Sequence, residues 1–101
     1  MGKKDIEIFM NDNFRVLRLM QNNITVINKA HICPMTQQEI AESLGFSLMK
    51  VNAIMITLRD GKYIDRYKNS RGRYVITTKG KKVLSIIDNN IDLEENNNGS
   101  N

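Results

Sequence analysis

The residues with the most evident chemistry in this sequence are the basic ones between Arg59 and Lys82. This stretch holds nine basic residues and two acids, a local charge of +7. Residues 1–87 combine all 15 Lys and Arg with seven of the 11 acids, so they carry +8 in a chain whose net charge is +4. A cluster of this density is typical of a surface that binds a polyanion, although a solvated face is the alternative for any charge run.

The sequence gives little evidence for a metal site or for a catalytic site. His31 and Cys33 are its one histidine and one cysteine, and two such ligands without a third do not make a zinc site. No nucleophile has a base and an orienting group at a useful spacing. We therefore expect no metal, no cofactor and no enzyme activity. A lone cysteine fits a reducing cytoplasm, and no apolar run is long enough to span a membrane.

A predicted helix-turn-helix, residues 36–64, leads into the basic stretch. Thr36 and Glu39 have the spacing of a capping box, and Gly45 is placed to end the first helix. Ser47 can cap a second helix. The second helix of such a motif is the one that enters the major groove of DNA. Its apolar residues follow the i, i+3, i+4, i+7 spacing of one buried face: Val51, Ile54, Met55 and Leu58.

An earlier helix is predicted from Asn13 to at least Gln21, with Asp12 or Asn13 as its cap. We expect it to continue to about Lys29, although residues 24–27 (ITVI) are β-branched and also fit a strand. The apolar positions that favour one continuous helix are Phe14, Leu17, Met20, Ile24 and Ile27.

The segment after the helix-turn-helix predicts a hairpin and a last helix. Residues 63–67 and 73–77 alternate like strands around the turn-forming residues 68–72, so the tip of the hairpin is basic. Thr77 or Thr78 then begins a helix with the apolar positions Val83, Leu84, Ile86 and Ile87.

These elements predict a mainly α protein with a small β-hairpin, an α+β fold in the order α-α-α-β-β-α. This is the order of a winged helix-turn-helix, in which the hairpin is the wing. We expect a flexible N-terminal segment at 1–12, the winged helix-turn-helix domain at 13–87, and a disordered, acidic, Asn-rich tail at 88–101 with too few apolar residues to order itself.

Residues 13–87 resemble a bacterial winged helix-turn-helix domain of the MarR-like superfamily. The matching pieces are T-Q-x-E-I-A at Thr36–Ala41, L-G-F-S at Leu44–Ser47, the core residues Val51 and Leu58, Tyr63-Ile64 at the start of the wing, and T-x-K-G at Thr77–Gly80.

The second helix of the motif departs from that superfamily on its solvent side, which is polar in typical members. At 100° per residue, Met49, Ala53 and Ile56 project opposite Val51 and form a second apolar stripe, which Asp60 continues. An apolar face of this kind needs a partner. We expect two copies to pack through this stripe in a homodimer; the alternatives are that the N-terminal segment covers it or that Met49 fills a gap.

This arrangement is similar to the TubR family, centromere-binding adaptors of plasmid and phage partition systems that use the tubulin-like GTPase TubZ. Members dimerise through the recognition helix and insert its N-terminal end into the major groove. The resemblance implies DNA contacts at the helix start, at the preceding helix, along the wing and after it, namely Ser47, Leu48, Met49, Lys50, Gln37, Lys68, Asn69, Ser70, Arg71, Arg73 and Lys79.

The function implied by this resemblance is a sequence-specific double-stranded DNA-binding homodimer, a partition adaptor that also represses its own operon. Its partners would be double-stranded DNA, a second copy of the chain in a homodimer that assembles further on DNA, and the tubulin-like GTPase TubZ. The alternative is a MarR-like transcriptional repressor. A third hypothesis is a winged helix that contacts only other proteins, but the basic wing is evidence against it.

Overall fold

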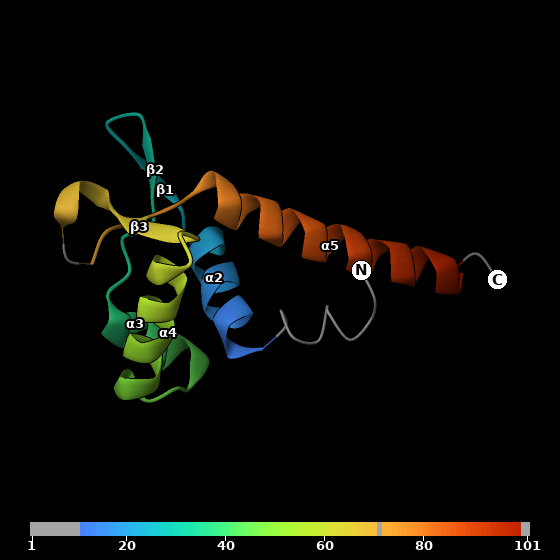
Figure 1. Ribbon diagram of the computed structural model, residues 1–101, viewed down its shortest axis with the longest axis horizontal. Coiled ribbons are helices and arrows are strands. Elements are labelled where there is room, and N and C mark those ends of the chain that lie inside the picture. Colours follow the sequence, from blue (N-terminus) through green and yellow to red (C-terminus); the bar gives the residue numbers. More distant parts are fainter. Residues whose placement is uncertain (1–10, 71, 100–101) are drawn as a thin grey trace.

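The computed structural model describes residues 11–70 and 72–99 of the chain, with side chains as far as Asn89. Most of the predicted flexible segment 1–12 and the predicted DNA contact Arg71 lie outside these residues. Within them the protein is mostly helical with a small antiparallel wing, which confirms the predicted α+β winged-helix fold (Figure 1). Among the described residues no single helix is long and apolar enough to cross a membrane; the helices Gln37–Leu44 and Leu48–Asp60 reach that length only together, across a bend of 114°.

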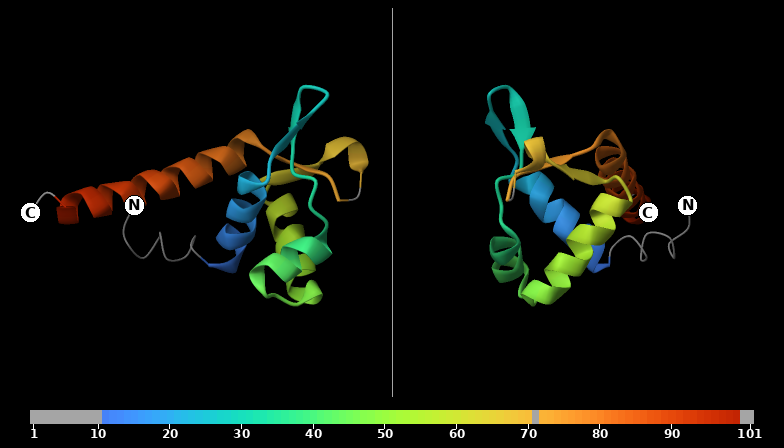
Figure 2. Two further views of the ribbon diagram at one scale, coloured as in Figure 1. Left: turned by 180° about the vertical axis from the view of Figure 1, so that it is seen from behind. Right: turned by 60° about the vertical axis from the view of Figure 1, so that its left-hand side comes forward.

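The elements follow one another in the order α2 (Asp12–Asn22), β1 (Thr25–Ile27), β2 (Ala30–Ile32), α3 (Gln37–Leu44), α4 (Leu48–Asp60), β3 (Ile64–Arg66), the 3-10 turn η1 (Tyr67–Asn69), β4 (Tyr74–Ile76) and α5 (Thr78–Gly99). The hairpins β1–β2 and β3–β4 form two separate two-stranded sheets. Figure 2 shows from two further sides that the β1–β2 hairpin and α5 project from the body in different directions.

The helix-turn-helix forms as its capping residues predict. The Thr36 side chain accepts a hydrogen bond from the Glu39 backbone N–H, and the Glu39 carboxylate accepts one from the Thr36 N–H, which completes the capping box and lowers the pKa of Glu39. Gly45 ends α3 in the left-handed conformation, with φ of 69°. The Ser47 hydroxyl accepts a hydrogen bond from the Lys50 N–H at the start of α4.

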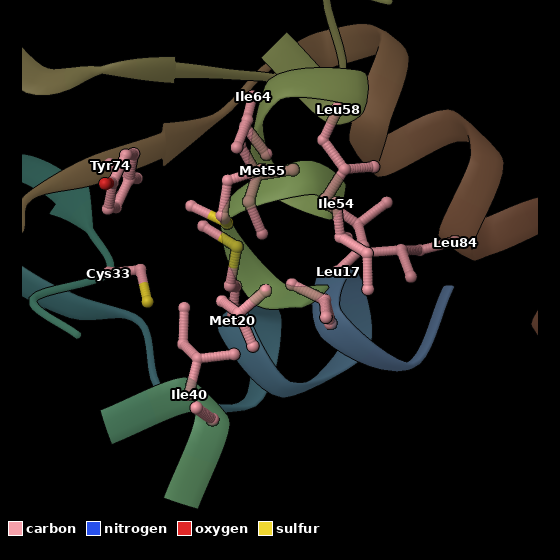
Figure 3. Packing of buried hydrophobic residues seen from close by; sticks show 14 residues of the cluster. Leu17, Met20, Cys33, Ile40, Ile54, Met55, Leu58, Ile64, Tyr74 and Leu84 are labelled. Carbon is pink, nitrogen blue, oxygen red and sulfur yellow. The ribbon is translucent and has the colours of Figure 1, made fainter. Parts of the chain in front are cut away.

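The core lies where α2, α3 and α4 meet under the wing (Figure 3). Met20 of α2 and Met55 of α4 are almost fully buried near its centre, beside Cys33 and Ile40. All four residues of the predicted α4 stripe, Val51, Ile54, Met55 and Leu58, are buried. Burial raises the pKa of the Cys33 thiol, so the cysteine acts as a small apolar side chain here.

The expected continuation of the first helix to Lys29 is wrong. Helix α2 ends at Asn22, where Asn23 caps it and donates its side-chain N–H to the Leu19 carbonyl. The β-branched residues that follow form β1, which pairs antiparallel with β2. Asn28 and Lys29 link the strands with φ of 50° and 67°, the two left-handed residues that a two-residue hairpin turn requires.

Both ends of the helical part also differ from the predicted bounds. Asn11, rather than Asp12 or Asn13, caps α2, because its side chain accepts from the backbone N–H groups of Asn13 and Phe14. At the other end α5 continues to Gly99, beyond residue 87 where we ended the domain. The helix bounds do not test the predicted disorder of 88–101, which stays a prediction.

The wing is attached to the body at two points. Cys33 and Tyr74 exchange backbone hydrogen bonds of 2.8 and 3.0 Å, so the segment before α3 pairs with β4 as a very short strand. The start of α5 lies against the start of β3: a Cβ placed on Gly80 would stand 2.3 Å from the Tyr63 carbonyl oxygen and 2.8 Å from Ile76 Cγ2. Gly80 is therefore required for this close approach.

We expect Gly80→Ala to lower the free energy of unfolding by about 1–2 kcal/mol, because the overpacking strain exceeds the gain in helix propensity. Urea unfolding followed by circular dichroism measures the change. Ser85→Ala, at an exposed position of the same helix, is the control and should stay within about 0.5 kcal/mol of wild type. An equally small effect of Gly80→Ala would show that α5 and β3 do not approach this closely in solution.

Candidate nucleic-acid interface

Helix α4 presents three different faces around its axis. The stripe that contains Val51 is buried in the core. Opposite it, Met49 is 83% exposed and Ile56 is 48% exposed, as the second apolar stripe predicted. Ala53 and Asp60 of that stripe are also exposed. The remaining sides carry polar residues, toward α2 in one direction and toward the wing in the other.

The N-terminal end of α4 is open to solvent. Ser47, Leu48, Met49 and Lys50, the predicted groove contacts, are all exposed. The Ser47 hydroxyl satisfies the Lys50 N–H. The other backbone N–H groups of the first turn are those that a helix start offers to a phosphate.

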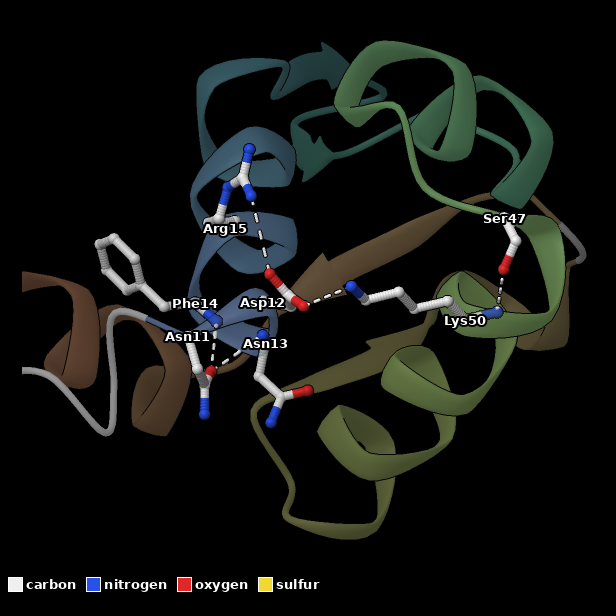
Figure 4. A network of polar contacts seen from close by, with 7 residues as sticks. All are labelled: Asn11, Asp12, Asn13, Phe14, Arg15, Ser47 and Lys50. Carbon is white, nitrogen blue, oxygen red and sulfur yellow. Dashed lines mark hydrogen bonds and ion pairs between the residues drawn. The ribbon is translucent and has the colours of Figure 1, made fainter.

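Lys50 points toward α2 rather than straight into solvent (Figure 4). Its Nζ lies 2.5 Å from Asp12 Oδ2 and 4.2 Å from the centroid of the Phe46 ring. The other carboxylate oxygen of Asp12 lies 3.6 Å from a guanidinium nitrogen of Arg15. The Arg15 guanidinium also lies over the Phe46 ring, 5.1 Å from its centroid. The hydrogen bond from Lys50 lowers the pKa of Asp12, so the carboxylate is charged at neutral pH.

The predicted wing contacts lie on a strained, exposed turn. Lys68 and Asn69 take φ of 49° and 58° within η1. The Lys68 ammonium lies 5.3 Å from the Tyr67 ring centroid, and the Ser70 N–H donates to the Tyr67 carbonyl. Arg73 is exposed, while its carbonyl accepts from the Tyr67 N–H and closes the turn. The turn therefore holds Lys68 and Arg73 on the surface.

Lys79 is placed differently from the other predicted contacts. Its Nζ donates to the Gly61 carbonyl oxygen at 2.7 Å and lies 4.5 Å from the Tyr63 ring centroid. Gly61 caps α4, so this ammonium sits at the negative end of that helix. Lys79 has a structural role here, and its contact with DNA stays a prediction.

A groove of about 450 Å³ separates α4 from the wing. Gln37, at the start of α3, lines one side. Asn52 of α4 and Arg66 of β3 line the others, with Thr36, Gly72 and Tyr74 completing the wall. The groove joins the helix-turn-helix to the wing, and most of its lining residues have polar side chains. It is the arrangement in which a helix and a wing can contact one duplex together.

Two residues beside the N-terminal half of α4, Asn52 in this groove and Asp12 on α2, were not predicted from the sequence. Asn52 follows Val51 by one position, so at 100° per residue it faces sideways, and the α4 spacing could have identified it. Asp12 pairs with Lys50 only because the fold brings α2 beside α4, and nothing in their spacing indicates it.

The described residues offer little for metal chemistry. Among them no three His, Cys, Asp or Glu side chains are grouped closely enough to hold an ion. His31 is exposed on β2 while Cys33 is buried, so the two point into different surroundings. The expectation of no enzyme activity is untested by this arrangement.

The fold is similar to that of a solved structure, the reduced (Fe(II)) CO-sensing protein from R. rubrum. The TM-score is 0.60 at 21% sequence identity, over 70% of this chain and 35% of that chain. The present chain thus spans about a third of that protein's length, and the similarity concerns the fold alone. A comparison with curated proteins gives no match.

The sequence matches a family model described as "Firmicute plasmid replication protein (RepL)" over residues 4–98. This range covers the winged helix, including the open end of α4 and the wing. The chain is therefore a plasmid-associated protein with a DNA-binding fold, and it belongs to the RepL family of Firmicute plasmid replication proteins.

Proposed function

We propose that this protein acts in plasmid replication by binding a double-stranded DNA site through the N-terminal end of α4 and the β3–β4 wing. The observation that carries the proposal is the groove in which the polar side chains of Gln37, Asn52 and Arg66 bring together α3, α4 and the wing. This groove lies within the family match, and three of its lining residues, Arg66, Gly72 and Tyr74, belong to the +7 basic stretch. The proposal places the protein in the cytoplasm, with plasmid DNA.

The chemistry of the two grooves of DNA indicates which groove α4 would contact and which the wing would contact. The major groove is wide enough to admit α4, whose exposed start offers backbone N–H groups to a phosphate. Met49 can contact a thymine methyl group. Lys68 and Arg73 on the wing would neutralise phosphates or enter a narrow minor groove.

A second candidate is the TubR-like partition adaptor, with a homodimer formed through α4. The observation that favours it is the exposed apolar pair Met49 and Ile56 on the helix face opposite the core. A symmetric contact of the two stripes would bury these side chains, leaving the start of α4 for DNA. Contact with TubZ, repression of the protein's own operon and the MarR-like repressor role remain further predictions of this kind.

Binding to DNA should weaken steeply with salt. We expect the logarithm of affinity for a mixed-sequence duplex of about 30 base pairs to fall by about 0.9 per phosphate neutralised for each tenfold rise in NaCl. Fluorescence anisotropy measures it. Arg73→Gln should reduce the slope by about 1, while Arg73→Lys, which keeps the charge, should preserve it. A binding constant that does not change with salt would contradict the proposal.

Lys50 must exchange Asp12 for a phosphate if it contacts DNA. Removing the internal competitor should therefore strengthen binding, and we expect Asp12→Asn to raise affinity about 1.5- to 5-fold, the range of an exposed ion pair. The same substitution in a Lys50→Met background should have little effect. Equal gains in both backgrounds would show that Asp12 acts through its general charge and that Lys50 makes no exchange.

The dimer prediction is tested by Ile56→Glu, with analytical ultracentrifugation as the measurement. If the stripes form a dimer, an unpaired buried charge should convert it to a folded monomer at the same protein concentration. Val26→Glu places the same charge at a 62% exposed apolar position of β1 and is the control. A wild-type monomer, or an Ile56→Glu dimer, would argue against the partition-type arrangement.

A further inference from the structure

We propose that Asn52 is the base-reading residue of this protein and that it selects adenine in the major groove. The proposal rests on the proposed DNA-binding function and deepens it, because it assigns sequence recognition to one side chain. Asn52 is not among the DNA contacts that the resemblance to the TubR family implied.

The position of Asn52 on α4 is the first step of the argument. It lies about 100° from Val51 around the helix, between the buried stripe and the exposed apolar stripe. Its side chain is exposed, and it borders the groove shared with Gln37 and Arg66. Asn52 also belongs to the N-terminal half of the helix, the part that a recognition helix presents to base edges.

Asn52 differs in its side-chain contacts from two asparagines that cap a helix. The Asn11 side chain caps α2, and the Asn23 side chain bonds to the Leu19 carbonyl. Within the described part of the chain, the amide of Asn52 has no hydrogen-bond partner. Asparagine is also a poor residue for a helix interior, so folding alone does not explain it there.

Arg66 and Gln37, which line the same groove as Asn52, are placed to hold the DNA backbone in position. Arg66 is exposed, and the Asp65 carboxylate fixes its backbone by accepting from the Arg66 N–H at 2.8 Å. Gln37 occupies the first turn of α3. From these two places a guanidinium and an amide can contact the phosphates on either side of the groove, which fixes the register of the base contact.

The chemistry of the amide selects the base. An asparagine side chain offers one acceptor and one donor group side by side, which match the N6 amino group and the N7 atom of adenine in the major groove. A bidentate contact of this kind discriminates against the wrong base by about 5- to 150-fold. The other polar side chains of α4 are less suited. Lys50 is held by Asp12, the Thr57 hydroxyl donates to the Ala53 carbonyl, and Arg59 and Asp60 lie in the last turn, far from the helix start.

The test is selection of bound duplexes from a library with a randomised core of about 20 base pairs, followed by sequencing. The full chain is used, as wild type and as three variants. We expect wild type to enrich a motif with a strongly preferred adenine. Asn52→Ala should lose the preference at that one position and keep the rest of the motif. Asn52→Asp should change the preferred base to cytosine, because a carboxylate accepts from the cytosine N4 amino group.

Asn22→Ala is the matched control, because Asn22 is an exposed helical asparagine at the far end of α2. It should select the wild-type motif. Circular dichroism of each variant establishes that the fold is kept.

The outcomes separate this inference from the proposed function. An unchanged motif with folded Asn52→Ala would overturn the base-reading role of Asn52. Wild-type binding that is salt-dependent but enriches no motif would overturn it as well, while DNA binding itself would stand. Failure of wild type to bind any duplex at low salt would overturn the proposed function and this inference together.

Discussion

The packing of one face of α4 is the interaction on which the rest of the structure depends. Four apolar side chains of this helix are buried against α2, α3 and the wing, each contributing about 1.5–3 kcal/mol of burial free energy. For a domain of marginal stability this is a large share of the total. Because the buried face fixes the rotation of α4, it also decides which residues can face DNA, which face α2, and which are left as an apolar stripe.

Some basic residues have partners within the protein, which reduces the positive charge that is available to a ligand. Lys50 is paired with Asp12, and Lys79 lies at the carbonyl end of α4. The Lys50 charge is therefore partly neutralised by a carboxylate, and the Lys79 ammonium already has a hydrogen-bond partner, before any ligand arrives. The wing residues Lys68 and Arg73 are exposed without such acidic neighbours among the contacts described. The net charge counted from the composition therefore overstates the positive charge that α4 offers to a ligand. It describes the positive charge of the wing more accurately.

Local signals predicted the parts of the fold that local chemistry determines. The capping box at Thr36, the left-handed Gly45 and the α4 stripe are all such cases, since each depends on residues a few positions apart. The β1–β2 hairpin was missed because Ile24 and Ile27 satisfy a helical spacing as well as a strand, and the turn at Asn28 and Lys29 has no glycine. The Asp12–Lys50 pair depends on tertiary packing, so no sequence pattern could indicate it. The RepL family was not recognised, because winged helices share a degenerate apolar pattern.

The β1–β2 hairpin has an evolutionary and practical consequence. The two residues at its tip are exposed. Of the residues in β1 and β2, Ile32 at the end of β2 is the one that is fully buried. Exposed tips of this kind tolerate changes in chain length, because the backbone there makes no contact that the core needs. Relatives could therefore lengthen or trim the hairpin while α4 and the wing stay in place. The same tip is a permissive position for inserting an affinity peptide or a fluorescent reporter.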